Sequence, residues 1–450
     1  MFKTLFQSGF VRNVSLLAGG TAFAQGIAIL ALPVLTRIYS PNEFGILGIF
    51  TALLGMISVI ATLRYEIAIP LPESDQSAAN LLGVALVCVA ATTVAVVVIV
   101  NLFGQQIVLL MKAPLLAKYL WLLPIAIAAT GAYSVFQFWA TRKKAFKRIA
   151  RTRVEQSIGG VTTQLLMGWT GTGALGLIVG QIVSNGAGFF GLARRAFSDD
   201  RTVLQGVGVA GMRAVAREYD RFPKFSTFEA LTNSASVQMP IILIAGLTAS
   251  AEVGYLMLAL RIMQAPMGII GASISQVYFS RAVEEHRNDR LGDFTARTIG
   301  GLAKIGIGPL IFVGIIAPSV FGLIFGAEWQ RAGELVAWMT PWFVLQFLVS
   351  PVSMSLHVTN NQRLALALQI VGVSLRVLMV LAAGAVLAGQ FVAETFAISG
   401  FLFYVFYLMV VCRVVNVTFT QKIKILKDAM PLVVLSVLLA IVVRAVLKMF

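Results

Sequence analysis

A succession of long apolar runs constrains the fold of this chain more than any other feature of its sequence. One set of six lies near residues 13–37, 44–64, 78–103, 115–141, 154–170 and 174–193, a second near 226–247, 253–279, 299–325, 335–358, 364–388 and 394–412, and a thirteenth run lies at 429–447. A helix of about 20 apolar residues crosses a bilayer, and hydrocarbon demands that each backbone satisfy its own hydrogen bonds. The runs therefore predict an all-α polytopic membrane protein with 12–13 transmembrane helices.

The distribution of charge gives these helices an orientation. Only 12% of the residues are charged, against about 25% in soluble domains. When the N-terminus is placed in the cytoplasm, most of the 35 Lys and Arg residues fall in cytoplasmic gaps, as the positive-inside rule requires. This distribution accounts for the formal net charge of +16, so the charge does not indicate nucleic acid as a partner.

The spacing of the runs predicts two halves. We expect an N-terminal six-helix lobe at residues 1–200, a cytoplasmic linker at 201–225 and a C-terminal six-helix lobe at 226–412, followed by a cytoplasmic segment and an extra helix at 413–450. Between the first two helices of each lobe a short motif recurs, Glu43-Phe44-Gly45 and then Glu252-Val253-Gly254. The motif and the six-plus-six count together favour two pseudo-symmetric parallel repeats.

Motifs of enzymes are missing from the sequence. There is no phosphate-binding loop, no H-E-x-x-H and no C-x-x-C, and the two histidines, His286 and His357, lie far apart. We therefore expect no catalytic residues, no metal and no cofactor. The outer loops are short, which disfavours a membrane sugar polymerase or transferase, because such enzymes need extended outer loops.

Three basic residues interrupt the apolar runs: Arg261, Lys304 and Arg376. A charge in the middle of a bilayer costs from roughly 3 to more than 10 kcal/mol, so it should face protein or water. Arg376 is central in its run and Arg261 lies about two turns from the outer end of its helix. An arginine can grip a phosphate with two parallel hydrogen bonds and stays charged, which suits an anionic ligand. Lys304 is close enough to a helix end to extend to the interface instead.

Other polar residues are candidates for the lining of a wet cavity. Arg37 and Arg64 lie near helix ends, where they either line the cavity or extend to the interface, and Glu66 and Glu229 are possible proton carriers or ion-pair partners. The uncharged candidates are Gln25, Gln137, Asn233, Gln264 and Gln346. For each of them the alternative is a helix-to-helix hydrogen bond, worth about 0.6 kcal/mol.

Two stretches resemble a known family. LTRIYSPNEFG at residues 35–45 and LRYEIAIP at residues 63–70 look like the opening of bacterial polysaccharide biosynthesis proteins of the oligosaccharide-lipid flippase (Wzx-type) family. This family belongs to the multidrug, oligosaccharidyl-lipid and polysaccharide (MOP) exporter superfamily. Arg37 and Arg64 lie inside the matching stretches, whereas Arg261 and Arg376 match no motif.

The resemblance implies a fold and a function. Two six-helix lobes would surround a central cavity in the bacterial inner membrane, with cavity cations receiving the substrate. The substrate would be an undecaprenyl-pyrophosphate-linked oligosaccharide, moved from the cytoplasmic to the periplasmic leaflet by alternating access. The implied partners are membrane lipid and, further, the polysaccharide polymerase and chain-length machinery. The alternatives are a peptidoglycan lipid-precursor flippase or a multidrug exporter of the same superfamily and, less expected, a membrane sugar polymerase.

Overall fold

The computed structural model describes residues 9–267, 271–386 and 391–447, and these form helices joined by short loops, with no β-strand among them. The all-α prediction is confirmed. Eleven helical stretches of the described chain are long and apolar enough to cross a membrane. Helix α8 (Phe146–Trp169) is not among them, because its first turns are rich in Lys and Arg.

The chain separates into two compact units, residues 1–39 with 43–246 and residues 40–42 with 247–450. The first unit contains α2 (Gly9–Leu30), α3 (Leu32–Ile38), α4 (Pro41–Ile60), α5 (Tyr65–Ala68), α6 (Asp75–Leu110), α7 (Leu122–Arg142), α8, α9 (Ala174–Gly186), α10 (Gly188–Asp199), α11 (Arg201–Gln205), α12 (Val209–Glu218) and α13 (Thr227–Leu247). The second contains α14 (Ser250–Pro266), α15 (Ala272–Arg287), α16 (Leu291–Leu302), α17 (Gly308–Phe325), α18 (Gln330–Val349), α19 (Ser355–Val358), α20 (Gln362–Val386), α21 (Val392–Val414) and α22 (Phe419–Leu447).

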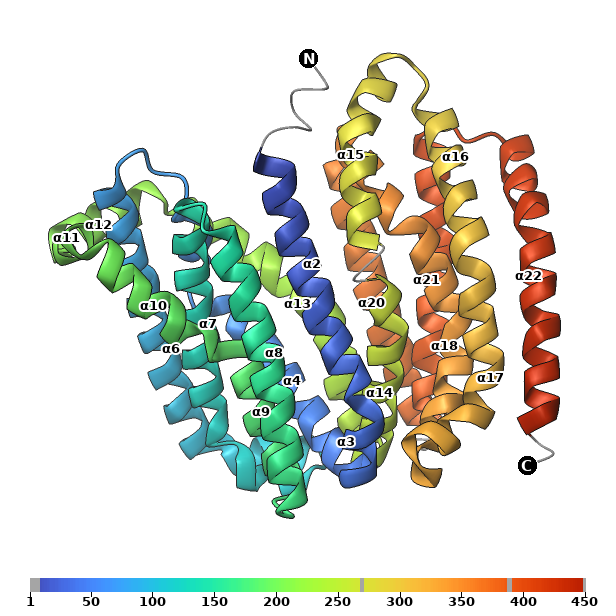
Figure 1. Cartoon of the computed structure of the whole chain (residues 1–450), viewed down its shortest axis with the longest axis horizontal. Helices are drawn as coiled ribbons and strands as arrows, with labels where there is room; N and C mark the ends of the chain where they lie inside the picture. The colour runs from blue at the N-terminus through green and yellow to red at the C-terminus, as the bar shows by residue number, and fades with distance from the viewer. Residues whose placement is uncertain (1–8, 268–270, 387–390, 448–450) are drawn as a thin grey trace. The chain divides into compact units, whose positions relative to one another are not determined.

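Small residues bring the helices of the first unit together. Helix α8 packs on both α2 and α9 (Figure 1). At the contact between α8 and α9, a Cβ on Gly180 would lie 2.7 Å from the carbonyl oxygen of Gly160, so the two backbones meet where no side chain fits. Ser157 on α8 donates a hydrogen bond to the carbonyl of Ala24 on α2 at 2.6 Å. Such close packing and interhelical hydrogen bonds hold helices together where lipid supplies no hydrophobic force.

Helix α13 packs with the first unit, although the sequence places the start of the C-terminal lobe at residue 226. Ser234 on α13 donates a hydrogen bond to the carbonyl of Gly55 on α4 at 2.9 Å, and the Gln238 side chain covers Gly55. Much of the expected linker at 201–225 is itself helical, in α11 and α12. The six-plus-six repeat behind the predicted lobes stays a prediction.

The second unit is built around α18. Helices α14, α17 and α21 all pack on α18, and α20 packs on α21. Helix α22 lies along α16 and α17 (Figure 1), and only 6% of its apolar window is buried. The core of this unit therefore lies among α14, α17, α18 and α21.

Candidate functional site

Arg376 lies in the middle of α20, where the sequence predicts a functional cation. Its guanidinium carbon is 5.3 Å from the ring centroid of Trp342 on α18 and 5.2 Å from that of Phe403 on α21. Tyr404 on α21 also faces the guanidinium. Gln346 lies on α18 one helical turn beyond Trp342. We call Arg376, Trp342, Phe403 and Tyr404, together with Gln346, the Arg376 cluster; cation–π contacts of this kind are worth up to about 2 kcal/mol when desolvated.

Two glycines make room for the aromatic rings of the cluster. A Cβ on Gly372 of α20 would lie 2.7 Å from the Phe403 ring, and one on Gly400 of α21 would collide with the indole of Trp342. The Phe396 ring meets the same indole edge-on, at a centroid distance of 5.2 Å. The rings that flank the guanidinium are therefore held in place by packing from several sides.

Several polar atoms of the Arg376 cluster lack partners. Within the described residues, Arg376 Nε, Trp342 Nε1 and Gln346 Oε1 are buried and accept or donate no hydrogen bond. Arg376 makes no ion pair with any carboxylate of the described chain. Buried polar groups in proteins are nearly always hydrogen-bonded, so a cluster of unmatched groups indicates a place for water or a ligand. A guanidinium without a carboxylate favours an anion there.

A second cation predicted from the sequence, Arg64, lies in the first unit beside a buried acid. Arg64 precedes α5 with a left-handed backbone (φ 64°), and its Nη1 is 3.7 Å from Oε1 of Glu66. Thr62 donates a short hydrogen bond to the other oxygen of Glu66, while Arg64 Nε is buried with no partner among the described residues. Burial raises the pKa of Glu66, against the opposing effects of the Thr62 hydrogen bond and the Arg64 charge. The group is therefore a carboxyl that can take up a proton more readily than a solvated one.

The remaining predicted residues are dispersed over the two units. In the first unit, Gln25, Arg37, Glu229 and Asn233 are exposed and Gln137 is half-buried. In the second unit, Arg261 is half-buried, Gln264 is exposed, and exposed Lys304 pairs with Asp428 of α22 at 3.2 Å. The structure thus brings Glu66 to Arg64, and it places Gln346 on α18 one helical turn from Trp342, which contacts Arg376. The role of each residue stays a prediction.

One charged group of the second unit was not expected from the sequence. Arg331, on α18, pairs with Glu252 on α14 at 2.8 Å, with Glu334 at 3.1 Å and with Glu394 on α21 at 2.5 Å. We call these four residues the Arg331 hub. Its acids lie in three separate helices, so no spacing in the sequence links them.

Solved structures show which class of protein this fold defines. The lipid II flippase MurJ in an inward-closed conformation is 15% identical, with a TM-score of 0.72 over 96% of this chain and 92% of that chain. An inward-facing multidrug resistance MATE family transporter of the MOP superfamily is 14% identical, with a TM-score of 0.66 over 87% and 95% of the two chains. No curated protein matches the sequence. The chain is thus a multi-pass membrane protein with the fold of the MOP transporters.

The family follows from the sequence itself. A model described as "Polysaccharide biosynthesis protein" matches residues 34–334. This range covers most of the chain and includes both stretches that carry the resemblance. The chain belongs to the polysaccharide biosynthesis protein family.

Proposed function

We propose that this protein is a flippase for a polyprenyl-pyrophosphate-linked oligosaccharide, undecaprenyl pyrophosphate being the expected carrier. It would move a repeat unit of O-antigen, capsule or exopolysaccharide to the periplasmic leaflet of the bacterial inner membrane. Membership of the polysaccharide biosynthesis protein family supports the glycan, and the MOP transporter fold supports movement by alternating access. The N-terminus would be cytoplasmic, since basic residues gather on that side.

The Arg376 cluster is the observation that carries this proposal. A sugar pyrophosphate brings negative charge and many hydroxyl groups, while the lipid tail can stay in hydrocarbon. The guanidinium of Arg376 supplies the positive charge, and the unpartnered Trp342 Nε1 and Gln346 Oε1 supply a donor and an acceptor. An anion at this place would offset the cost of a cation buried without a carboxylate.

Other cations would assist the passage of the charged head group. Arg64, Arg37 and Arg261 are proposed to contact it at other stages, with Glu66 as a group that can exchange a proton. The ion pair with Asp428 favours an interfacial role for Lys304 over contact with the substrate. The membrane potential would give direction, because moving one negative charge outward is favourable by about 2.3 kcal/mol per 100 mV.

The experiment is deletion of the gene followed by complementation. We expect the deletion strain to lose surface polysaccharide and to accumulate its lipid-linked precursor, and the wild-type chain to restore export. We expect Arg376→Ala to lower export at least tenfold at equal membrane protein level, because roughly 1.4 kcal/mol of lost anion binding already gives that factor. Arg290→Ala, which removes an exposed arginine of the same unit, should restore export fully. Continued export in the deletion strain would contradict the proposal.

A peptidoglycan precursor flippase is the second candidate, favoured by the similarity to MurJ over nearly the whole chain. Depletion separates the two functions. Lysis of growing cells would indicate the cell-wall precursor, and loss of surface polysaccharide alone would indicate the proposal above. A multidrug exporter for organic cations is disfavoured, because the Arg376 cluster presents a positive charge.

A further inference from the structure

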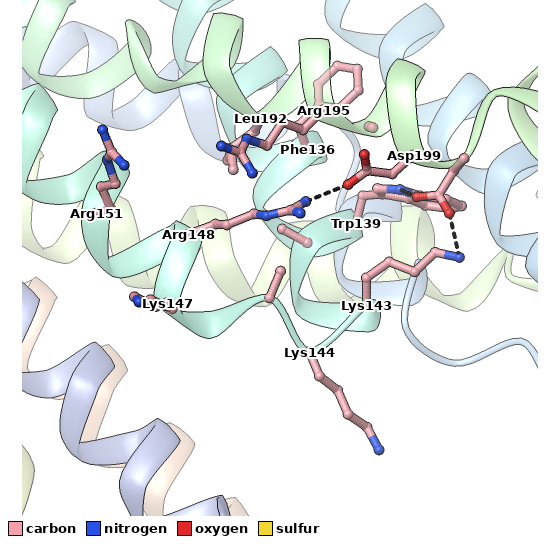
Figure 2. A pocket seen from close by; sticks show the side chains of 14 residues that line it. Phe136, Trp139, Lys143, Lys144, Lys147, Arg148, Arg151, Leu192, Arg195 and Asp199 are labelled. Atoms are coloured by element: carbon pink, nitrogen blue, oxygen red, sulfur yellow. Dashed lines mark hydrogen bonds and ion pairs between the residues drawn. The ribbon is translucent and has the colours of Figure 1, made fainter.

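A basic hollow lies in the first unit, and neither Arg64 nor any residue of the Arg376 cluster lines it. It opens beside the turn that joins α7 to α8 and is bounded on its other side by α10 (Figure 2). Six basic side chains line it, namely Lys143, Lys144, Lys147, Arg148, Arg151 and Arg195. Its volume is about 620 Å³, and an adjoining hollow of about 540 Å³ shares Arg148, Arg151 and Arg195. We call the two together the α8–α10 hollow; each volume is in the range of ligand sites.

The acids in the main part of this hollow are already neutralised. Asp200 accepts a hydrogen bond from Trp139 Nε1 at 2.9 Å and pairs with Lys143 at 2.9 Å. Asp199 pairs with Arg148 at 2.9 Å, as the dashed line between these two residues in Figure 2 shows. The two aspartates therefore hold Lys143 and Arg148 in place, and Lys143 also pairs with Asp75 at 2.8 Å. The six basic residues of the main part outnumber its two acids.

Two basic residues of the hollow, Lys147 and Arg195, have no carboxylate partner. Among the residues described, they make no ion pair and no side-chain hydrogen bond, and both are exposed. Lys147 lies on α8 and Arg195 on α10, so the unpaired charges come from both walls. They lie beside Arg148, which pairs with Asp199, and Arg151, which pairs with Glu155 at 2.6 Å. The unpaired Lys147 and Arg195 therefore give this concave surface an excess of positive charge.

The position of the α8–α10 hollow, at the ends of membrane spans, indicates a lipid as its ligand. Two candidate membrane spans, Leu122–Arg142 and Ala174–Asp199, end at its rim. The buried side chains of Phe136, Leu192 and Ala196 lie at the base of the hollow, and the exposed Phe197 ring has its centroid 6.0 Å from that of Phe136. Basic groups at the ends of two membrane spans, close to an exposed aromatic ring, match a phosphate head group whose acyl chains lie in the adjoining hydrocarbon.

We propose that the α8–α10 hollow binds the head group of an anionic glycerophospholipid of the surrounding leaflet. The arginines would grip the phosphate, and Lys147 would add charge from the rim. This inference does not depend on the proposed transport function, because it concerns binding of a resident lipid to the first unit.

The test is native mass spectrometry of the full-length purified protein titrated with phosphatidylglycerol. Each basic residue near a phospholipid surface is worth about 1 kcal/mol, or about fivefold in affinity. The double variant Lys147→Gln/Arg195→Gln should therefore bind about 25-fold more weakly. The matched control Lys424→Gln/Lys427→Gln, which removes two exposed lysines of α22, should bind within about twofold of wild type. Phosphatidylcholine should bind at least tenfold more weakly than phosphatidylglycerol to the wild-type chain.

Four outcomes would overturn the proposal. Equal losses in the two double variants would indicate diffuse attraction by net charge, and equal affinity for the two phospholipids would indicate no charge selection. Displacement of phosphatidylglycerol by millimolar inorganic phosphate would assign the hollow to a free anion. Its displacement by an equimolar amount of undecaprenyl pyrophosphate would assign the hollow to the transported lipid. Both double variants exchange exposed residues, and circular dichroism will confirm that each is folded.

Discussion

Removal of Arg331 should destabilise the second unit far more than loss of an ordinary arginine. The side chain of Glu394 is only 4% exposed, and its Oε2 has no hydrogen-bond partner among the described residues, so Arg331 is its counter-charge. Arg331→Ala would leave that carboxylate buried and unpaired, which typically costs about 3–5 kcal/mol. Glu334, at 46% exposure and three residues along the same helix, adds only about 0.3–0.5 kcal/mol.

The assay is unfolding of the purified protein in detergent, followed by circular dichroism as sodium dodecyl sulfate is added. We expect Arg331→Ala to lower the free energy of unfolding by about 3–5 kcal/mol. Adding Glu394→Gln to that variant should recover about half of the loss, because the buried group is then neutral. The control is Arg290→Ala, whose 3.2 Å pair with Glu285 joins an arginine at 60% exposure, and it should cost less than about 1 kcal/mol. An Arg331→Ala loss no larger than the control, or no recovery with Glu394→Gln, would refute the reasoning.

Two further predictions concern a close packing contact and a titrating carboxyl. Gly400→Ala places a methyl group against the Trp342 indole and should cost about 1–3 kcal/mol in the same unfolding assay. Gly301→Ala, where no atom lies within 4 Å, should be neutral or stabilise by up to about 1 kcal/mol; equal effects at the two glycines would contradict the packing argument. Because burial raises the pKa of Glu66 above the ordinary value of about 4.5 for a glutamate, the folded state binds its proton more tightly than the unfolded state. Wild-type stability should therefore decline as pH rises from about 4.5 through the folded pKa, and the Glu66→Gln variant should lack this decline. A Glu155→Gln control, at an exposed acid, should titrate like wild type, and a decline that persists in Glu66→Gln would assign it to another group.

The helices could be predicted from the sequence because each helix that crosses a bilayer needs a run of about 20 apolar residues. Where a helix contains charged residues or a proline, its bounds were predicted less well. Helix α8 begins at Phe146, eight residues before the predicted start at 154, because its charged first turns have no apolar signal. The first run, predicted to be continuous, is divided at Ala31 into α2 and α3, just before Pro33 in the first turn of α3.

The candidate site could be predicted only in part, because a residue is found from the sequence only where it stands out from the residues around it. Arg376 is conspicuous in an apolar run, and Trp342 and Gln346 are four residues apart in another run, so they share one face of that helix. Phe403 gave no signal, since aromatic residues crowd its segment and only the packing of α20 on α21 selects this one. The Arg331 hub was missed because its acids are near separate helix ends, where a charge is ordinary.

Helix α22 lies at the edge of the second unit, with little of its surface buried. It touches the rest of the second unit along a narrow seam, where a Cβ on Gly308 would lie 2.5 Å from Ser436 Oγ and where Lys304 pairs with Asp428. Between Met430 and Ile441 its exposed surface is apolar and faces away from the rest of the unit, so its tilt is set more by the surrounding lipid than by its neighbours. A bilayer a few ångströms thicker or thinner can be accommodated by reorientation of this helix about its seam. The hydrophobic mismatch is then absorbed at the periphery, and the helices around Arg376 keep their packing.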